Sequence, residues 1–368
     1  MDGLDVLVRS DLNVPLTDSE VADDFRIQAA IPTWQTLLDH GAGVTVCSHL
    51  GRPKGEDPEL SMRPVAERIA ELTGWDVKLD RPGGELTVLE NTRFNPGETS
   101  NDDRFADELA AGRDLFVQDA FGSVHRSHSS TVGVAERVES VAGPLLAAEL
   151  EALGRFLGEP DRPYTVVLGG AKVADKIGVV RRLLPKVDRM LIGGGMCFTF
   201  LAAQGNEVGN SIVDEERLDE VKRLMDGPNG RKIILPVDVA VADRFAEDAR
   251  RKVVGVFEIP SGWIGLDIGP GTAAGFRELI QSAASVFWNG PMGVFEWESF
   301  RRGTDLVARA LAACDGFTAA GGGDSAAALR LLGLEDAVSH LSTGGGAGLE
   351  LLEGRVLPGV AVLERWVS

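Results

Sequence analysis

The sequence is poor in cysteine and has no long hydrophobic stretch. Only three of its 368 residues are cysteines, Cys47, Cys197 and Cys314, and their odd number and wide spacing argue against disulfides or a zinc site. No run of 18 or more apolar residues occurs, and the first residues lack the basic and apolar regions of a secretory signal. These absences predict a cytoplasmic protein with no membrane partner, whose cysteines are buried thiols.

Positive charge is also scarce. The formal net charge is −19, and only eight of the 37 basic residues are lysines. A chain this acidic would repel phosphate backbones, so we expect no nucleic-acid partner. Where such a protein nevertheless clusters its arginines, we expect the cluster to bind an anion.

Several catalytic motifs are missing. The five histidines form no His-Glu-x-x-His pattern, and no Gly-x-Ser-x-Gly segment occurs, which disfavours a zinc protease and a serine hydrolase. The Gly-x-Gly-x-x-Gly pattern of dinucleotide-binding enzymes and the Gly-Lys-Ser/Thr ending of a Walker A loop are absent too. A nicotinamide-dependent dehydrogenase is therefore a poor interpretation.

The length suits two domains of ~150–200 residues each. Short apolar runs alternate with helical patterns along the chain, which predicts parallel sheets built from βαβ units. We expect strands at 6–8, 44–47, 88–89, 115–118, 166–168, 190–192, 233–235, 265–268, 286–288, 317–319 and 340–342. We expect helices at 27–40, 65–73, 145–157, 216–225 and 304–313. The segment 145–157 and the loop 158–163 mark the expected domain boundary.

The first half carries side-chain donors after its strands. Arg26, Arg52, Arg93 and Arg126, with His49 and His125, are suited to phosphate and carboxylate groups. A single arginine is more often a surface ion-pair residue. Four of them in or near strand-end segments favour an anion site, although spacing alone does not prove that they converge.

The second half carries glycine-rich segments instead. Gly169–Lys176 follows an apolar strand and leads into an expected helix; if that helix has begun by Lys172, then Lys172 and Lys176 share one face. Gly321–Ser325 also joins a strand to an expected helix at 326–332. Asp324 there is either the N-cap of the helix or a ligand for Mg²⁺ beside nucleotide phosphates. A third junction, Ser342–Ala347, offers glycine amides that would stabilise negative charge.

Nine strings of the sequence carry a family resemblance. They are VRSDLNVP, SHLGRPKG, ENTRF, DAFGSVHRSHSS, LGGAKVADKI, GGGMCFTFL, WNGPMGVFE, GGGDSAAA and STGGGAGLELLEG. In this order they resemble phosphoglycerate kinases over nearly the whole chain. The resemblance implies two Rossmann-like α/β domains with mainly parallel sheets facing a central cleft. It implies a monomer that transfers a phosphoryl group reversibly between 1,3-bisphosphoglycerate and ADP, giving 3-phosphoglycerate and ATP after a hinge movement, with Mg²⁺ as cofactor.

The resemblance also implies site residues. Residues 1–150, joined by the tail 355–368, would bind the triose, and residues 151–354 would bind the Mg-nucleotide. The implied triose ligands are Asp11, Asn13, Arg26, His49, Arg52, Arg93 and Arg126. The implied nucleotide ligands are Gly170, Lys172, Lys176, Gly194, Asn289, Glu296, Gly322, Gly323, Asp324 and Ser325, with Asp324 on the metal. Arg26, Lys172, Gly345 and Gly346 would act on the transferred group.

Two departures from the family pattern fall on the nucleotide side, and neither removes an essential residue. Gly271 stands where the family commonly has lysine, which removes one possible phosphate contact, and Ser325 replaces the commoner threonine. The first alternative is another two-domain ATP-dependent enzyme acting on a small phosphorylated acid. The second is a catalytically silent scaffold, which would not need Arg26 and Lys172 together.

Overall fold

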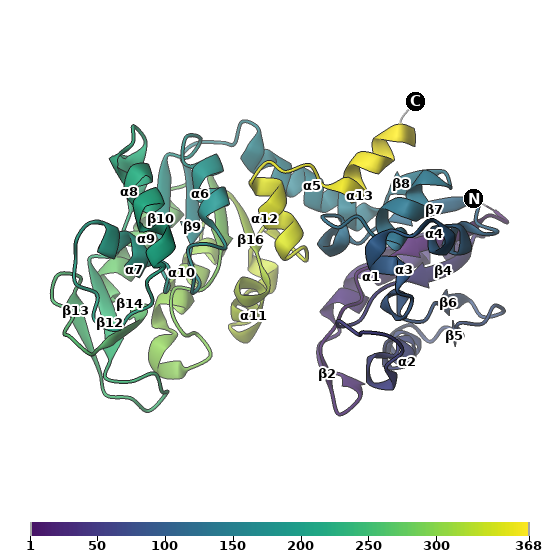
Figure 1. Ribbon diagram of the computed structural model, residues 1–368, viewed down its shortest axis with the longest axis horizontal. Helices are drawn as coiled ribbons and strands as arrows, with labels where there is room; N and C mark the ends of the chain where they lie inside the picture. Colours follow the sequence, from purple (N-terminus) through teal and green to yellow (C-terminus); the bar gives the residue numbers. More distant parts are fainter. Residues whose placement is uncertain (1, 367–368) are drawn as a thin grey trace. The chain divides into compact units, whose positions relative to one another are not determined.

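The chain forms two compact units. The computed structural model describes residues 2–366, and the chain divides into Met1–Glu151 with Arg355–Ser368, called unit 1, and Ala152–Gly354, called unit 2 (Figure 1). The boundary falls inside helix α5 (Pro144–Leu157). Within residues 2–366 no helix is both long enough and apolar enough to cross a bilayer.

Unit 1 is built on a six-stranded parallel sheet in the order β5-β6-β4-β1-β7-β8. Its strands are β1 (Asp5–Arg9), β4 (Gly43–Cys47), β5 (Val77–Leu79), β6 (Leu86–Val88), β7 (Leu115–Gln118) and β8 (Ser140–Ala142). The valine-rich strands β1 and β4 are buried over their last four residues, as expected of strands covered on both faces. A small hairpin, β2 (Leu16–Thr17) and β3 (Glu20–Val21), follows β1.

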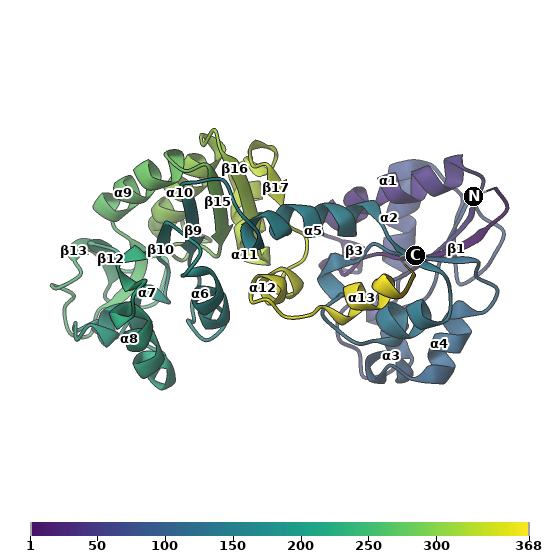
Figure 2. The same cartoon turned by 90° about the horizontal axis from the view of Figure 1, so that it is seen from above.

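Helices cover both faces of this sheet. They are α1 (Phe25–Asp39), α2 (Arg63–Thr73), α3 (Gly97–Ser100), α4 (Asp103–Ala110) and α13 (Pro358–Ala361). In Figure 2, α1 and α2 lie on one side of the strands and α3, α4 and α13 on the other. The apolar spacing of Ile27, Ala30, Trp34 and Leu37 places one stripe of α1 in the core against β1 and β4. The returning C-terminal segment is fixed to this unit because the amide of Gly359 donates to the carbonyl oxygen of Val124 (2.9 Å).

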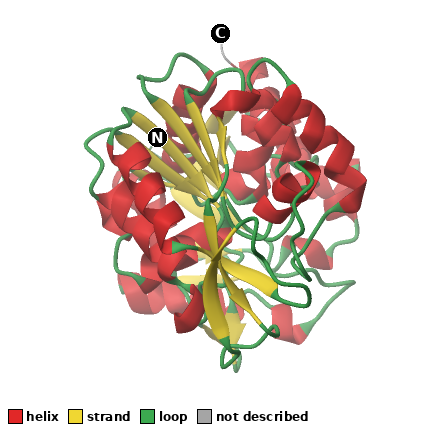
Figure 3. Ribbon diagram, turned by 90° about the vertical axis from the view of Figure 1, so that its left-hand side faces the viewer, coloured by secondary structure: helices red, strands yellow, loops and turns green. Residues whose placement is uncertain are grey.

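Unit 2 contains a second six-stranded parallel sheet in the order β11-β10-β9-β15-β16-β17. Its strands are β9 (Tyr164–Leu168), β10 (Arg189–Ile192), β11 (Ile233–Ile234), β15 (Ser285–Asn289), β16 (Phe317–Gly321) and β17 (His340–Leu341). Its helices are α6 (Ile177–Leu183), α7 (Cys197–Ala203), α8 (Leu218–Asp226), α9 (Pro270–Gln281), α10 (Arg302–Ala312), α11 (Gly323–Leu331) and α12 (Gly346–Leu352). Figure 3 shows these strands side by side with helices around them. Val286 and Trp288 share a core with α9 and α10, whereas Phe287 faces the opposite way and contacts the ring of Phe156 (centroids 5.6 Å apart).

Unit 2 also has a three-stranded antiparallel sheet, in the order β13-β12-β14. Its strands are β12 (Asp238–Ala242), β13 (Arg251–Gly255) and β14 (Ile264–Ile268). The strand predicted at 265–268 is present as β14. The prediction that it belongs to a parallel sheet is wrong, because β14 pairs antiparallel with β12. The glycine segment after β14 is accordingly held by Asp238, whose carboxylate accepts the amides of Gly271 (2.9 Å) and Thr272 (2.7 Å).

The mixed α/β architecture with mainly parallel sheets is confirmed. Every strand expected from the sequence overlaps an observed strand, and each helix expected in the list above overlaps an observed helix. Strands β5, β8, β12 and β13 have no counterpart in the prediction, nor do the two strands of the hairpin. Strand β13 is mostly exposed and begins with two basic residues, so it lacks the apolar pattern on which the prediction depends.

Candidate active site

The strand order of each parallel sheet marks where a ligand would bind. Ligands of such sheets lie beyond the carboxyl ends of the strands, where the order reverses direction. In unit 1 the chain leaves β1 toward β4 and returns to β7, so the reversal lies between β1 and β7. In unit 2 it leaves β9 toward β10 and returns to β15, so the reversal lies between β9 and β15.

The arginines predicted for unit 1 come together around Arg93. An Nη1 atom of Arg93 donates to the carbonyl oxygen of Gly51 at 2.5 Å, and its buried Nε has no hydrogen-bond partner among residues 2–366. Burial lowers the pKa of its guanidinium, and the positive charges of Arg126, Arg9 and Arg52 lower it further. Like charges have such an effect only at short range, so the cluster that spacing alone could not prove is present.

His49 belongs to the same cluster. Burial holds the pKa of its imidazole well below its usual value, and the nearby positive charges of Arg9 and Arg93 act in the same direction. His128 and Arg26 contribute smaller effects of the same sign. These positive charges all disfavour a second proton on His49. A bound anion would be stabilised by the same charges.

Arg26 is held by a carboxylate. Its Nη1 lies 2.7 Å from Oδ1 of Asp11, and the two side chains are 31% and 10% exposed, respectively. The same nitrogen lies 3.4 Å from the carbonyl oxygen of Asn13. Asp11 and Asn13 follow β1, whereas Arg26 comes from the first turn of α1, so these contacts fix the guanidinium at the edge of the sheet.

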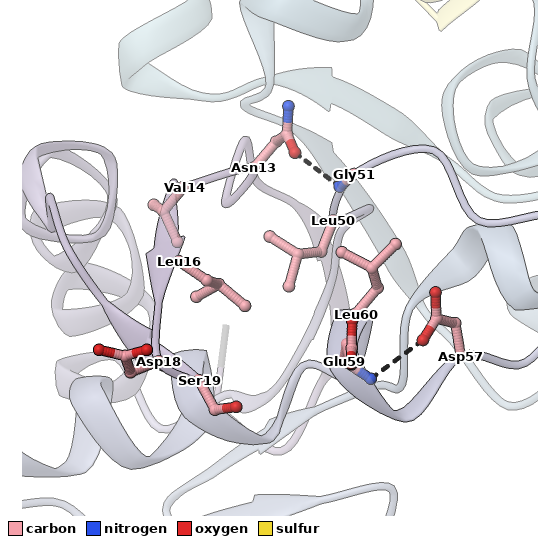
Figure 4. A pocket seen from close by; sticks show the side chains of 10 residues that line it. All are labelled: Asn13, Val14, Leu16, Asp18, Ser19, Leu50, Gly51, Asp57, Glu59 and Leu60. Atoms are coloured by element: carbon pink, nitrogen blue, oxygen red, sulfur yellow. Dashed lines mark hydrogen bonds between the residues drawn. The ribbon is translucent and has the colours of Figure 1, made fainter.

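A pocket of about 540 Å³ opens beside Asn13 (Figure 4). Oδ1 of Asn13 accepts the amide of Gly51 at 2.8 Å, and its amide nitrogen points away from that contact. The pocket walls include the carboxylates of Asp18, Asp57 and Glu59. Because these charges would repel phosphate, the arginine cluster is a better candidate for an anion site than this pocket.

Lys176 occupies the reversal point of the sheet in unit 2. Its amine donates to the carbonyl oxygens of Gly169 (2.6 Å) and Asn289 (3.1 Å), which follow or end β9 and β15. The helix prediction for this segment needs correction: α6 begins at Ile177, so Lys172 lies outside it and the two lysines do not share a helical face. Lys172 is exposed, whereas Lys176 is buried.

Asn289 and Ser325 connect neighbouring strand ends. The side-chain amide of Asn289 donates to the carbonyl oxygen of Gly321 (2.7 Å), and the hydroxyl of Ser325 accepts the amide of Gly290 (2.7 Å). Both side chains are buried. They therefore brace the loops after β15 and β16, a structural role that the sequence does not reveal.

Asp324 does not cap its helix. Helix α11 begins at Gly323, its N-cap is Gly322 with φ 90°, and no side chain bonds there to the first-turn amides. Asp324 stands in the first turn with an exposed side chain, close enough to Lys176 to affect its pKa. The capping alternative is thus wrong, which leaves the carboxylate available for a ligand.

Glycines bring the other loops of unit 2 together. Gly194 has φ 62°, and a Cβ there would lie 2.5 Å from the amide nitrogen of Gly170 and 2.7 Å from the carbonyl oxygen of Pro291. Gly345, with φ 50°, is the N-cap of α12, which begins at Gly346. The side chain of Glu296, on the loop after β15, is exposed.

Comparisons with known proteins identify the family of the chain. The family profile described as phosphoglycerate kinase matches residues 1–355. The chain belongs to the phosphoglycerate kinase family. The phosphoglycerate kinase of Salinispora tropica is 55% identical over 98% of this chain and 96% of its own length, and that of Rubrobacter xylanophilus is 56% identical over 98% and 95%. The structure of phosphoglycerate kinase from Coxiella burnetii has a TM-score of 0.91 at 39% identity, covering 100% of this chain and 97% of that one.

Membership of the phosphoglycerate kinase family establishes the reaction. The chain is a phosphotransferase of glycolysis that acts between 1,3-bisphosphoglycerate and ADP. Both the resemblance and the reaction predicted from it are confirmed.

Two fully buried charged residues beside Arg93 escape the sequence-based prediction. Arg9 and Glu98 have no exposed surface, and both lie in the electrostatic surroundings of Arg93. Arg9 ends a strand of buried valines, which is an unusual place for an arginine. That position is the only signal in the sequence that could have drawn attention to it.

Proposed function

We propose that unit 1 binds 3-phosphoglycerate or 1,3-bisphosphoglycerate and that unit 2 binds ADP or ATP with Mg²⁺. The observation that carries this assignment is the convergence of arginines around Arg93, where burial and like charges disfavour the cation of Arg93 unless an anion is bound. Unit 2 instead offers glycine amides and two lysines near its reversal point. Arginine forks suit the phosphate and carboxylate of a triose, whereas glycine loops let backbone amides approach nucleotide phosphates.

The triose site would combine donors with one acceptor. Arg26, Arg52, Arg93 and Arg126 supply charge, and the amide nitrogen of Asn13 supplies a neutral donor. Asp11, which already positions Arg26, is a carboxylate that can accept the hydroxyl of a glycerate. This combination favours a phosphorylated hydroxy acid over a simple phosphate.

Phosphoryl transfer here requires no protein nucleophile, since the carboxylate of 3-phosphoglycerate attacks in line. Catalysis then depends on positioning and on the stabilisation of charge. Arg26 and Lys172 neutralise the transferred group, and the amides of Gly345 and Gly346 assist as fixed donors. We also expect a hinge movement between the units to exclude water before transfer.

The nucleotide would be held by the loops of the second sheet. Lys176 and the amides of Gly322 and Gly323 would contact its phosphates, and Glu296 would complete its surroundings. The prediction that Gly170 and Gly194 bind the nucleotide needs correction for their amides, which already donate to the carbonyl oxygens of Pro291 (2.8 Å) and Met292 (3.1 Å). Asn289 and Ser325 would act by bracing the loops around the nucleotide. No cluster of three or more candidate metal-binding side chains occurs within residues 2–366, so Asp324 would hold Mg²⁺ together with phosphate oxygens and water. The metal, when bound, neutralises phosphate charge. The single exposed carboxylate of Asp324 fits that requirement.

Nucleotide binding should take up protons near pH 8. Burial lowers the pKa of Lys176 to about 8, and Asp324 and Asp175 offset part of that effect. The amine is therefore half-protonated at that pH, and nearby phosphates would raise its pKa, so binding should take up as much as ~0.5 proton. Calorimetry in two buffers of different ionisation enthalpy measures this number. Uptake should vanish at pH 6.5 and in Lys176→Met; uptake that persists in the variant would contradict the assignment.

We also propose that the protein is a monomer in the cytoplasm.

The proposed reaction is tested by ATP consumption that depends on both 3-phosphoglycerate and Mg²⁺, with the product removed by a coupled NADH-consuming dehydrogenase. Strict dependence of ATP consumption on both 3-phosphoglycerate and Mg²⁺ would support the proposed function. Nucleotide binding without turnover would instead favour a kinase with another acid substrate, and neither binding nor turnover would favour a scaffold.

A further inference from the structure

Arg9 lies at the reversal point of the sheet in unit 1 and is completely buried. Its Nε donates to the hydroxyl of Ser130 (2.9 Å), and its Nη1 donates to the hydroxyl of Ser48 (3.2 Å). Its Nη2 lies 2.9 Å from Nδ1 of His49 and 3.3 Å from the hydroxyl of Ser123. One guanidinium thus joins the loops that follow β1, β4 and β7.

The charge of Arg9 is balanced inside the protein. The hydroxyl of Ser130 donates in turn to Oε1 of the buried Glu98 (2.7 Å), and the amide of Ser130 donates to its Oε2 (3.0 Å). Burial would raise the pKa of Glu98, but the hydrogen bond from His128 and the charge of Arg9 outweigh it and lower that pKa. Arg9 and Glu98 are therefore both charged, and Arg9 is not an additional free cation for a substrate.

The contact between Arg9 and His49 is compatible with only one tautomer of the imidazole ring. A guanidinium has five N–H donors and no acceptor, so Nδ1 of His49 must accept with its lone pair. The ring cannot then be an imidazolium, and its single proton is on Nε2. The charged and titratable groups that face the ring, namely Arg9, Arg93, His128 and Arg26, all oppose a second proton.

We propose that Arg9 is a positioning residue that fixes His49 as the neutral Nε2–H tautomer, so that His49 gives the triose site an uncharged hydrogen-bond donor. The inference rests on the proposed assignment of His49 to that site. A neutral donor orients an anionic oxygen without cancelling its charge, which preserves the nucleophilicity of an attacking carboxylate. Charge neutralisation is left to the arginines, and the donor stays unchanged across physiological pH.

The tautomer can be measured directly on the full-length protein. Long-range ¹H–¹⁵N spectra of ¹⁵N-histidine-labelled protein separate the two neutral tautomers and the imidazolium of its five histidines. We expect one ring with an unprotonated Nδ1 and a protonated Nε2 that does not titrate between about pH 5.5 and 8. That signal should be missing from His49→Gln, which assigns it. An imidazolium or an Nδ1–H tautomer at residue 49 would overturn the proposal.

Substitution tests whether Arg9 is the cause. Arg9→Lys keeps a positive charge near Glu98, but one ammonium cannot reach the acceptors that the guanidinium joins. We expect His49 to populate both tautomers and the KM for 3-phosphoglycerate to rise about tenfold, the loss of one positioned hydrogen bond, with the KM for ATP unchanged. Unchanged spectra and KM values in a folded variant would refute the role of Arg9.

Arg113→Lys is the matched control. Arg113 also donates to β4, through the hydroxyl of Thr45 (2.8 Å), but makes no hydrogen bond to His49. The Arg113→Lys variant should keep the Nε2–H tautomer of His49 and both KM values. An equal change in the tautomer and in the KM for 3-phosphoglycerate would overturn the proposal. If Arg9→Lys does not fold, the wild-type spectra still decide the tautomer. Because the spectra need no turnover, an inactive wild-type protein would refute the proposed function and leave this inference decidable.

Discussion

Arg26→Ala should lower turnover about 10²- to 10³-fold while leaving nucleotide affinity nearly unchanged. The side chain belongs to unit 1 and is fixed by Asp11 at 2.7 Å, so its guanidinium is already oriented before the reaction. A preorganised charge acts mainly where charge develops, which is in the transition state. Steady-state kinetics with 3-phosphoglycerate, together with equilibrium binding of ADP, separate the two quantities.

Two further variants sharpen this test. Arg26→Lys keeps the charge but not the planar fork, so it should recover only part of the turnover. Arg68→Ala removes another arginine of unit 1, one that pairs with Asp24 and Glu71 on the protein surface and should leave turnover unchanged. Comparable losses of turnover and of nucleotide affinity in Arg26→Ala would contradict a role in transfer.

The sequence predicts the parallel sheets well because their strands are buried on both faces. Such strands appear as continuous apolar runs, as in β9 and β15, where every residue is buried. Strand β13 is exposed over its first three residues, and its pairing depends on β12 rather than on its own pattern. Local composition therefore could not reveal the antiparallel sheet.

Prediction of the site residues from the sequence has a similar limit. Residue types predict Arg93 and His49 as candidate anion ligands, but only the fold shows that the charges of Arg9 and Arg93 act on the His49 ring. Likewise, the spacing of Lys172 and Lys176 suggests one helical face, whereas the helix begins only at Ile177, after a turn at residues 174–176. A four-residue interval has this meaning only inside a helix.

Lys172 and Lys176 should respond differently to replacement, because one side chain is exposed and the other is buried. Lys176 is buried and bonded to two carbonyl oxygens, so its removal would disturb the loops as well as the ligand. Lys172 is exposed and makes no hydrogen bond or ion pair with another residue of the described range 2–366. A cation with no structural partner is available to act on the transferred phosphoryl group.

Lys172→Ala should therefore lower kcat at least ~10²-fold without lowering the thermal stability of the protein, as expected when one charge donor is removed from a transition state. Lys172→Arg should retain more activity because the charge remains. Lys222→Ala, which removes an exposed lysine from α8, is the matched control and should behave like the wild type. Stopped-flow or steady-state turnover and a melting curve measure both quantities. A near-normal rate in Lys172→Ala would remove this residue from the mechanism and leave Arg26 as the main cation at the transferred group.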